Sequence, residues 1–262
     1  HLCHLLPGHS HLSLYLLLSS TDGSKTRYRR CGAPCVERVL YRPALHLPIL
    51  ESCLEGKYFE KGLDIGCGTG HSSIALANFC NEIVGLDPSL DMLNKAVIDK
   101  KVNYLHWDEK KLPFPNFYFG IVTLAGSWYY GQSQYLLDEL TRVTQSGGKV
   151  LLYDFNIVLN EVLRLLNIPN AESSYNHQVN FSKFHSNHLH EVEMKKSSIT
   201  ISITSQQLAH LILSVKPYYL FLEQKWGKQA VFLKTENTIQ PYLSSARSIL
   251  TSYIYSTLYQ KK

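Results

Sequence analysis

Hydrophobic and polar positions alternate regularly between about residue 60 and residue 155. Short apolar runs that end at polar residues predict buried strands, and segments with apolar residues at helical spacing predict helices between them. The expected strands are 62–65, 82–87, 102–106, 119–125 and 149–155, and the expected helices are 72–80, 90–99 and 134–143. Strands that alternate with helices in this way predict a doubly wound, mostly parallel α/β sheet.

The pattern changes after residue 155. An apolar stripe predicts a helix over 156–167, and the residues from there to 198 are polar. We interpret 156–198 as an insertion that caps the ligand site at one edge of the sheet. Beyond it, the sequence predicts a helix over 205–213, an antiparallel hairpin of strands 218–224 and 230–234, and a final amphipathic helix from Leu243 to Leu258. The complete sheet is expected to hold about seven strands.

These patterns divide the chain into four parts. Residues 1–36 are expected to be a poorly ordered leader, and 37–155 the ligand-binding half of an α/β domain. The cap, 156–198, follows, and 199–262 completes the same domain with the final helix.

Composition and charge narrow the classes of function. A chain of 262 residues with 45% hydrophobic residues is long enough for one large domain with its own core. The formal net charge of +5 is too small to argue for nucleic acid, and no apolar run reaches the ~20 residues that span a bilayer. The six cysteines lack zinc-site spacing and are interpreted as reduced thiols, so we expect a cytoplasmic protein without a bound metal.

A glycine-rich loop follows the first expected strand, in the run Leu63–His71. Glycines at 66, 68 and 70 let the backbone turn tightly and approach a ligand, and the next helix points free N–H groups at it. The spacing is GxGxG rather than the GxGxxG of dinucleotide sites, and Asp64 stands where those sites hold an apolar residue. A carboxylate there suits a cationic amino-acid ligand.

Two further acids end neighbouring strands. Asp87 lies 21 residues after Gly66, where a carboxylate can accept both hydroxyls of a ribose, although an Asp before Pro88 can also cap a turn. Asp108 follows the third strand with Trp107 before it. Asp108 could accept a hydrogen bond from the amino group of an adenine whose ring is covered by an apolar side chain. Alternatively, it could be a solvated acid in a loop.

Five segments in this order resemble class I S-adenosylmethionine-dependent methyltransferases, which have a Rossmann-like fold. The segments are LDIGCGTG, GLDPSLDML, HWDEKKLPF, IVTLAGSWYY and LTRVTQSGGKVLLYDF. The similarity is closest to the small-molecule branch that includes trans-aconitate methyltransferases and enzymes of ubiquinone and menaquinone biosynthesis. It implies an enzyme that binds S-adenosylmethionine and releases S-adenosylhomocysteine.

The resemblance also implies roles for individual residues. Asp64, Gly66 and Gly68 would surround the methionine part of the cofactor. Asp87 would bind the ribose, and Asp108 would bind the adenine. The other residues that we assign to the cofactor site are Cys67, Gly70, Pro88, Met92, Trp107 and Ala125. The sequence departs from the family where strand four begins with Phe119-Gly120 instead of Phe-Asp.

The acceptor is less clearly indicated. The Asn/Asp-Pro-Pro-aromatic tetrad of amine-methylating enzymes is absent after strand four, and so is a basic run for RNA, which leaves a small molecule with a carboxylate or hydroxyl. The family's His-Trp pair appears as Ser127-Trp128, so no histidine base can be carried over there. Ser127, Trp128 and Tyr129 are candidates for the acceptor pocket, with plain packing as the alternative. His177 in the cap is a candidate base, with a solvated side chain as the alternative.

Two other classes of function stay open at this point. The chain could be a non-catalytic, methyltransferase-like binding or regulatory protein, or it could methylate RNA or protein. A nicotinamide-dependent dehydrogenase is disfavoured by Asp64 and by His71 in the sixth place of the loop. We expect a monomer or a homodimer.

Overall fold

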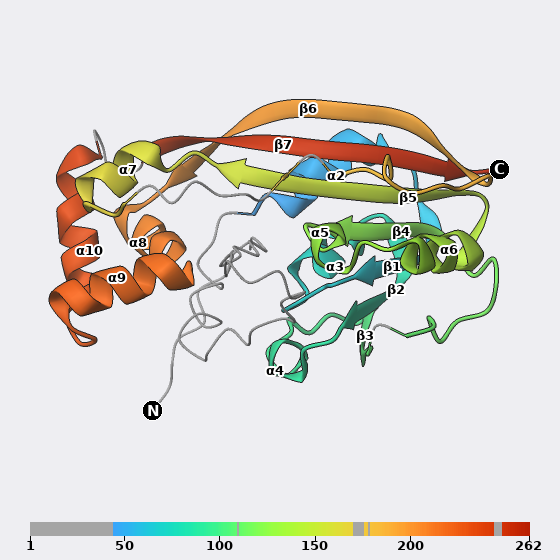
Figure 1. The fold of residues 1–262 in the computed structure, drawn as a ribbon, viewed down its shortest axis with the longest axis horizontal. Helices are drawn as coiled ribbons and strands as arrows, with labels where there is room; N and C mark the ends of the chain where they lie inside the picture. Colours follow the sequence, from blue (N-terminus) through green and yellow to red (C-terminus); the bar gives the residue numbers. More distant parts are fainter. Residues whose placement is uncertain (1–43, 109, 170–175, 178, 244–247) are drawn as a thin grey trace.

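The computed structural model describes residues 44–262 except 109, 170–175, 178 and 244–247 (Figure 1). The expected leader, 1–36, lies outside the described residues. Among the residues that are described, no helix is both long and apolar enough to cross a membrane.

The molecule is built on a seven-stranded sheet in the order β3-β2-β1-β4-β5-β7-β6. Neighbours from β3 to β5 pair in parallel, whereas β7 is antiparallel to both β5 and β6. The strands are β1 (Phe59–Ile65), β2 (Cys80–Asp87), β3 (Val102–His106), β4 (Phe119–Ala125), β5 (Thr144–Ile157), β6 (Leu189–Ile203) and β7 (Ser248–Lys261). The predicted doubly wound, mostly parallel sheet with antiparallel C-terminal strands is therefore confirmed.

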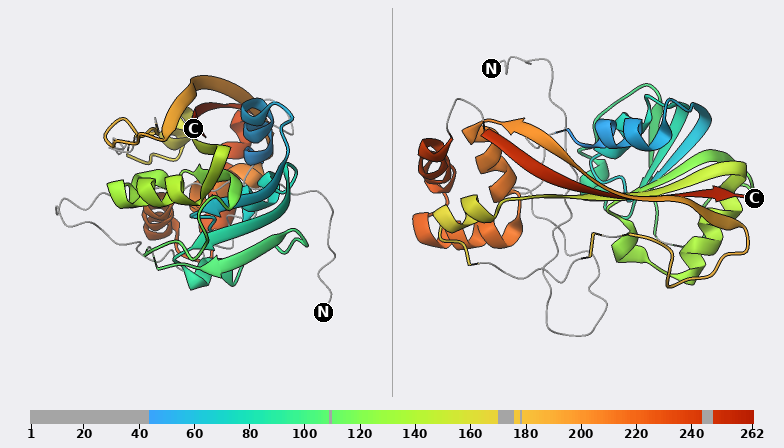
Figure 2. Two further views of the ribbon diagram at one scale, coloured as in Figure 1. Left: turned by 90° about the vertical axis from the view of Figure 1, so that its right-hand side faces the viewer. Right: turned by 90° about the horizontal axis from the view of Figure 1, so that it is seen from above.

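Helices cover both faces of the sheet (Figure 2). On one face, α2 (His46–Leu54) and α3 (His71–Leu76) pack against residues such as Ile121 and Tyr153. On the other face, α5 (Trp128–Gly131) and α6 (Gln134–Val143) pack against Val122 and Leu152. The central strands are thus buried on both sides, which explains their continuous apolar runs.

The glycine loop and the other expected site residues lie at the carboxyl edge of the parallel strands. Helix α6 has the predicted bounds, and so do β3 and β4. The helices expected over 72–80 and 90–99 are shorter, since α3 ends at Leu76 and α4 spans only Leu90–Leu93. Cys80 belongs to β2 instead of α3.

A helical lobe stands at one end of the long strands β5, β6 and β7 (Figure 1). It contains α7 (Asn160–Leu165), α8 (Ser205–Leu213), α9 (Lys216–Trp226), α10 (Val231–Ile239) and the short η1 (Gln240–Tyr242). Helix α8 has the predicted bounds, and a capping box formed by Thr204 and Gln207 begins it. Because β5 and β6 both run toward this end, the lobe lies on the carboxyl side of the sheet.

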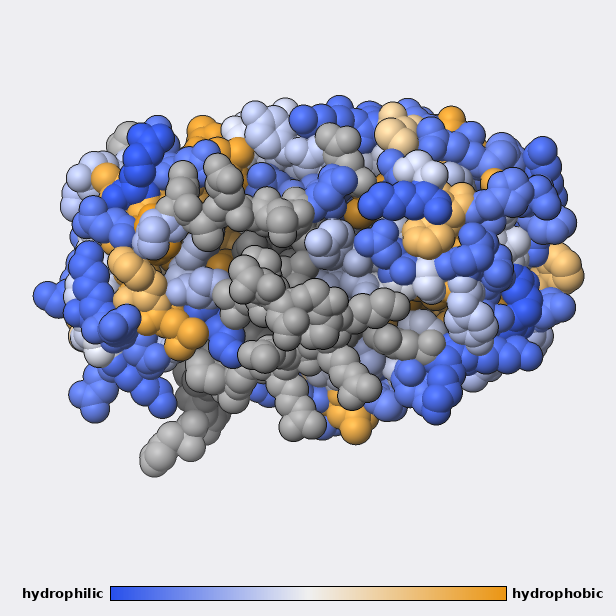
Figure 3. Space-filling view, viewed as in Figure 1, coloured by the Kyte–Doolittle hydropathy of each residue, from blue (hydrophilic) through white to orange (hydrophobic). Residues whose placement is uncertain are grey.

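The hairpin predicted from 218–224 and 230–234 is wrong, because these segments lie in α9 and α10. Pro217 in the first turn suits a helix start, and Tyr219 and Leu222 are buried at helical spacing. The lobe also exposes hydrophobic side chains among polar ones (Figure 3), including Leu220 (47% exposed) and Leu233 (60% exposed).

The final helix predicted from Leu243 to Leu258 is also wrong, because 248–261 forms β7. Ile254 and Leu258 are four residues apart, and a separation of four places side chains on one face of a strand as well as of a helix. The polar end of the predicted cap, from Leu189, belongs to β6. This is an edge strand with one solvated side, and such strands carry polar and charged residues.

Candidate cofactor and acceptor site

The glycine loop joins β1 to α3. Gly66, Gly68 and Gly70 have φ angles of 73°, 56° and 85°, in the left-handed region that glycine enters without steric cost. A Cβ on Gly66 would lie 2.3 Å from the Cβ of Ser127, and one on Gly70 would lie 2.0 Å from the Tyr104 hydroxyl oxygen. The loop is tied to β2 because Gly66 and Cys67 donate their backbone N–H groups to the carbonyl of Leu86. The sequence motif therefore forms a fixed concave backbone.

Asp64 lies beneath this loop and is fully buried. Its carboxylate accepts hydrogen bonds from the hydroxyls of Ser72 (2.6 Å) and Ser73 (2.7 Å) in α3. Thr123 in β4 donates a third at 2.9 Å. Burial raises the pKa of Asp64, and the three hydroxyl donors oppose that shift. In this arrangement Asp64 joins α3 and β4 to β1, so its contacts are those of a residue that shapes the loop.

Asp87 ends β2 and is also fully buried. One carboxylate oxygen accepts the backbone N–H of Gly68 at 2.8 Å, and the other accepts that of Ser89 at 2.8 Å. Asp87 therefore links the glycine loop to the start of α4, where Met92 is half-buried.

The loop after β3 reaches the same place. Trp107 donates its backbone N–H to the carbonyl of Asp87 at 3.2 Å, and its indole N–H to the carbonyl of Lys110 at 2.8 Å. Trp107 as a whole is 8% exposed. Asp108 points to solvent and forms a 2.6 Å ion pair with Lys110, whose hydrogen bond lowers the pKa of Asp108.

A cavity of about 110 Å³ lies between these elements. It brings together four residues that the sequence assigned to the site: Gly66, Pro88, Trp107 and Ser127. Ile65, Leu124 and Leu136 supply apolar walls. The ends of β1, β2, β3 and β4 thus converge on one space, as the topology of an open parallel sheet requires.

Comparison with known proteins agrees with this geometry. Residues 63–152 match the family model described as a methyltransferase domain. Demethylmenaquinone methyltransferases from Bacillus cereus (strain AH187) and Bacillus anthracis (strain A0248) are 39% identical over 102 residues. The alignment covers 35% of this chain and 43% of each relative, so the chain spans less than half the length of these relatives.

Residues 63–152 are thus similar to methyltransferase domains. The resemblance to class I S-adenosylmethionine-dependent methyltransferases is confirmed. A solved structure of a proposed type II methyltransferase from Anaeromyxobacter dehalogenans has the same fold, with a TM-score of 0.57 and 16% identity. That superposition covers 76% of this chain and 88% of the other.

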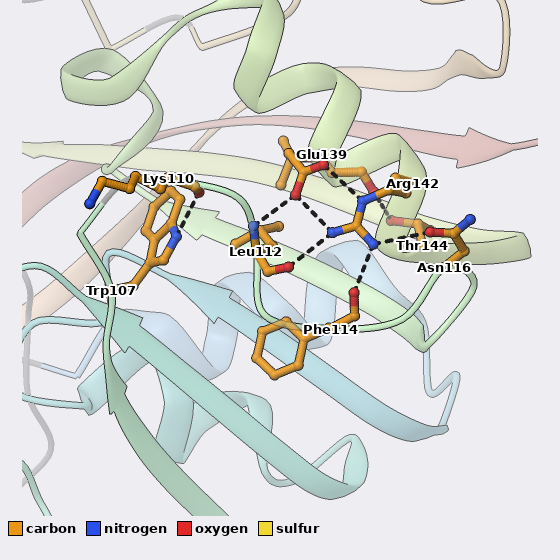
Figure 4. A network of polar contacts seen from close by, with 9 residues as sticks. Trp107, Lys110, Leu112, Phe114, Asn116, Glu139, Arg142 and Thr144 are labelled. Atoms are coloured by element: carbon orange, nitrogen blue, oxygen red, sulfur yellow. Dashed lines mark hydrogen bonds and ion pairs between the residues drawn. The ribbon is translucent and has the colours of Figure 1, made fainter.

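Helix α6 holds the loop after β3, a feature that the sequence reasoning missed (Figure 4). Arg142 donates to the carbonyls of Leu112 (3.0 Å) and Phe114 (2.7 Å). Glu139 pairs with Arg142 at 2.7 Å and accepts the backbone N–H of Leu112 at 2.7 Å. The only signal in the sequence was an acid and a base at i and i+3 on a predicted helix.

The three residues expected at the acceptor pocket have different surroundings. Ser127 donates its hydroxyl to the carbonyl of Ile65 at 2.5 Å and lines the cavity. Trp128 is 2% exposed, packs edge-on against Phe181 and donates its indole N–H to the carbonyl of Asn180. Trp128 is thus packed against the segment that contains Asn180 and Phe181. Tyr129 is half-buried in α5.

His177 is held by a carboxylate at the end of β5. Its Nδ1 lies 3.0 Å from a carboxylate oxygen of Asp154, and its ring stacks on Tyr255 with 5.9 Å between centroids. Its side chain is 24% exposed, whereas that of Asp154 is 7% exposed. The sequence reasoning missed Asp154. Within the described part of the chain, no three His, Cys, Asp or Glu side chains are grouped to hold a metal ion.

Proposed function

We propose that this protein transfers a methyl group from S-adenosylmethionine to a small molecule. The observation that carries the proposal is the glycine loop, which has three left-handed residues and donates the N–H of Gly68 to the carboxylate of Asp87. A Cβ at Gly66 or Gly70 would strike the side chain of Ser127 or Tyr104, so only glycine lets the loop keep this backbone shape. The residues present fit the cofactor.

The cofactor, when bound, supplies a methyl group on a positively charged sulfur. Asp87 would hold the ribose through its carboxylate, which the N–H groups of Gly68 and Ser89 already fix. Trp107, Asp108 and Met92 would enclose the adenine, and Gly66 and Gly68 the methionine part. Methyl transfer mainly requires that the acceptor is aligned with the methyl group. Such alignment can lower the activation barrier by ~7–11 kcal/mol.

The acceptor would enter from the carboxyl edge of the sheet. We propose that the lobe of α7–α10, with the segment around His177, caps this edge in place of the 156–198 insertion inferred from the sequence. The relatives are named for demethylmenaquinone, a small organic acceptor, which supports a small molecule over nucleic acid. We also propose a cytoplasmic monomer or homodimer.

Isothermal calorimetry with S-adenosylmethionine and S-adenosylhomocysteine tests the proposal. We expect micromolar binding, about −8 kcal/mol, and at least tenfold weaker binding by Asp87→Ala. Asp91→Ala is the matched control, because Asp91 is an exposed acid four residues along the chain. Circular dichroism establishes that each variant is folded. Absence of binding by the folded, unaltered protein would overturn the proposed function.

A further inference from the structure

A short segment of the chain lies along one face of β7 and fixes His177 at the end of the sheet. The Thr257 hydroxyl donates to the carbonyl of Val179 at 2.7 Å, and the Tyr259 hydroxyl accepts the N–H of Phe181 at 2.9 Å. The ring of Tyr255 stacks under His177 with 15° between the planes. Residues 255, 257 and 259 point to the same face of β7. They contact residues 177, 179 and 181, respectively.

Asp154 completes the arrangement from the neighbouring strand. It pairs in register with Tyr255, and one of its oxygens accepts the N–H of Phe155 while the other contacts His177 Nδ1. A buried carboxylate at Nδ1 fixes the tautomer that carries its proton on Nδ1 and its lone pair on Nε2. This is the arrangement that orients a histidine as a base.

The pair is connected to the glycine loop by a short series of contacts. Tyr153, next to Asp154, accepts the backbone N–H of Gly126 at 2.8 Å. Ser127 follows Gly126 and lies against Gly66. His177 and Asp154 are therefore at the carboxyl edge, between the glycine loop and the helical lobe.

We propose that His177 is the general base for an acceptor with an ionisable hydroxyl, a phenol or an enol, and that Asp154 positions it. This inference rests on the proposed function. His177 Nε2 takes the hydroxyl proton as the acceptor forms its bond to the methyl carbon. The electron pair of the carbon–sulfur bond stays on sulfur, which becomes neutral, and His177 passes the proton to solvent. A carboxylate acceptor would need no such base.

One cation also lies over the ring of Tyr255. Lys196 in β6 pairs in register with Tyr255, and its ammonium lies 5.3 Å from the centre of that ring. Among the described residues, Asp154 from β5 and Tyr255 from β7 contact His177, and Lys196 from β6 lies over the Tyr255 ring. The positive charge of Lys196 would favour an ionised phenol beside the Tyr255 ring.

A spectroscopic titration tests the proposal without turnover. 4-Nitrophenol and 4-nitrocatechol would be added to the protein saturated with S-adenosylhomocysteine, at a pH where the free phenols are mostly neutral. We expect absorbance of the phenolate form on binding, at least tenfold less of it with His177→Gln, and an intermediate amount with Asp154→Asn. His185→Gln is the control, because the exposed His185 contacts Asn187.

The same samples separate this proposal from the proposed function. Calorimetry with S-adenosylhomocysteine should give the same affinity for His177→Gln as for the unaltered protein. Ionisation that survives in His177→Gln, or no ionisation of either phenol by a protein that binds S-adenosylhomocysteine, would overturn the role of His177. Methylation of carboxylic acids alone would do the same. Failure to bind S-adenosylhomocysteine would instead overturn the proposed function.

Discussion

Gly66 and Ser127 are packed so closely that residue 66 has no room for a side chain. A Cβ at position 66 would lie 2.3 Å from the Ser127 Cβ, while the Ser127 hydroxyl donates to the carbonyl of the preceding residue, Ile65. The end of β4 thereby fixes the loop that follows β1. Gly66 and Ser127 therefore form one wall of the cavity, where the glycine loop packs directly against the start of α5.

Replacing Gly66 with alanine should damage the cofactor site. Alanine pays about 1–2 kcal/mol in the left-handed region and must also displace Ser127. We expect Gly66→Ala to lower the affinity for S-adenosylhomocysteine at least tenfold, measured by calorimetry. Gly147→Ala is the matched control, since Gly147 has a φ of 75° and a Cβ there would meet no atom within 4 Å. Equal loss of affinity in both variants would contradict the role of the contact.

The pair of Glu139 and Arg142 should stabilise the domain more than an exposed pair of the same spacing. Their side chains are 10% and 20% exposed, and Arg142 also satisfies two carbonyls of the loop after β3. Removing hydrogen bonds to a charged group costs about 1.5–3 kcal/mol each where the partners stay buried. Because Arg142 serves two such carbonyls, we expect Arg142→Ala to lower the free energy of unfolding by at least about 3 kcal/mol, measured by urea denaturation.

Arg164→Ala provides the comparison. Arg164 and Glu161 have the same i, i+3 spacing, but they lie 3.7 Å apart and their side chains are 74% and 86% exposed. Exposed pairs contribute about 0–1 kcal/mol, so this variant should change stability little. If the two arginine variants were equally destabilised, the contacts of Arg142 with the two carbonyls would add nothing to the stability of the protein.

The first half of the fold could be predicted from sequence because local and long-range preferences agree there. Each strand of the parallel sheet is a short apolar run. The spacing of the glycines indicates a tight turn between β1 and α3. Asp87 was placed by its distance along the chain from Gly66. The contact between Asp64 and three hydroxyls could not be predicted, because it depends on how α3 and β4 meet around β1.

The second half was harder because its patterns are ambiguous. The four-residue spacing of Leu250, Ile254 and Leu258 fits a strand and a helix equally, and the β-branched and aromatic residues between them decide for the strand. The aromatic run in α9 has strand-like composition, yet packing within the lobe makes it helical. Asp154 meets His177 only because β5 pairs with β7, which no local signal reveals.

Lowering the pH should remove the contribution of Glu139 to the free energy of unfolding. The hydrogen bond from Arg142 holds the pKa of Glu139 below its ordinary 4.5. A carboxyl with a depressed folded pKa adds stability above the unfolded value and loses it as the pH falls through the folded one. We expect Glu139→Gln to be less stable than the unaltered protein at neutral pH, and the difference to shrink below 4.5. Urea denaturation at several pH values measures it, and a difference that stays constant into acid would contradict the assignment.

Buried thiols give a final prediction that concerns the core beneath the glycine loop. Cys67 is 1% exposed, and burial together with the nearby carboxylates Asp64 and Asp87 raises its pKa far above the ordinary 9.0. Burial raises the pKa of Cys80 to about 12. Because the thiolate is the form that reacts, neither residue should be modified by a maleimide at neutral pH in the folded protein.

Peptide mapping by mass spectrometry after maleimide treatment would measure this. Peptides that contain Cys67 or Cys80 should stay unmodified in the native protein and become modified fully in guanidinium. Asp87→Ala supplies a sharper test, because loss of the carboxylate that holds Gly68 would loosen the loop around Cys67 but leave the start of β2 at Cys80 unchanged. Faster modification of Cys67 alone would show that Asp87 holds the loop in place. Equal modification of both thiols would point to general unfolding and contradict that local role.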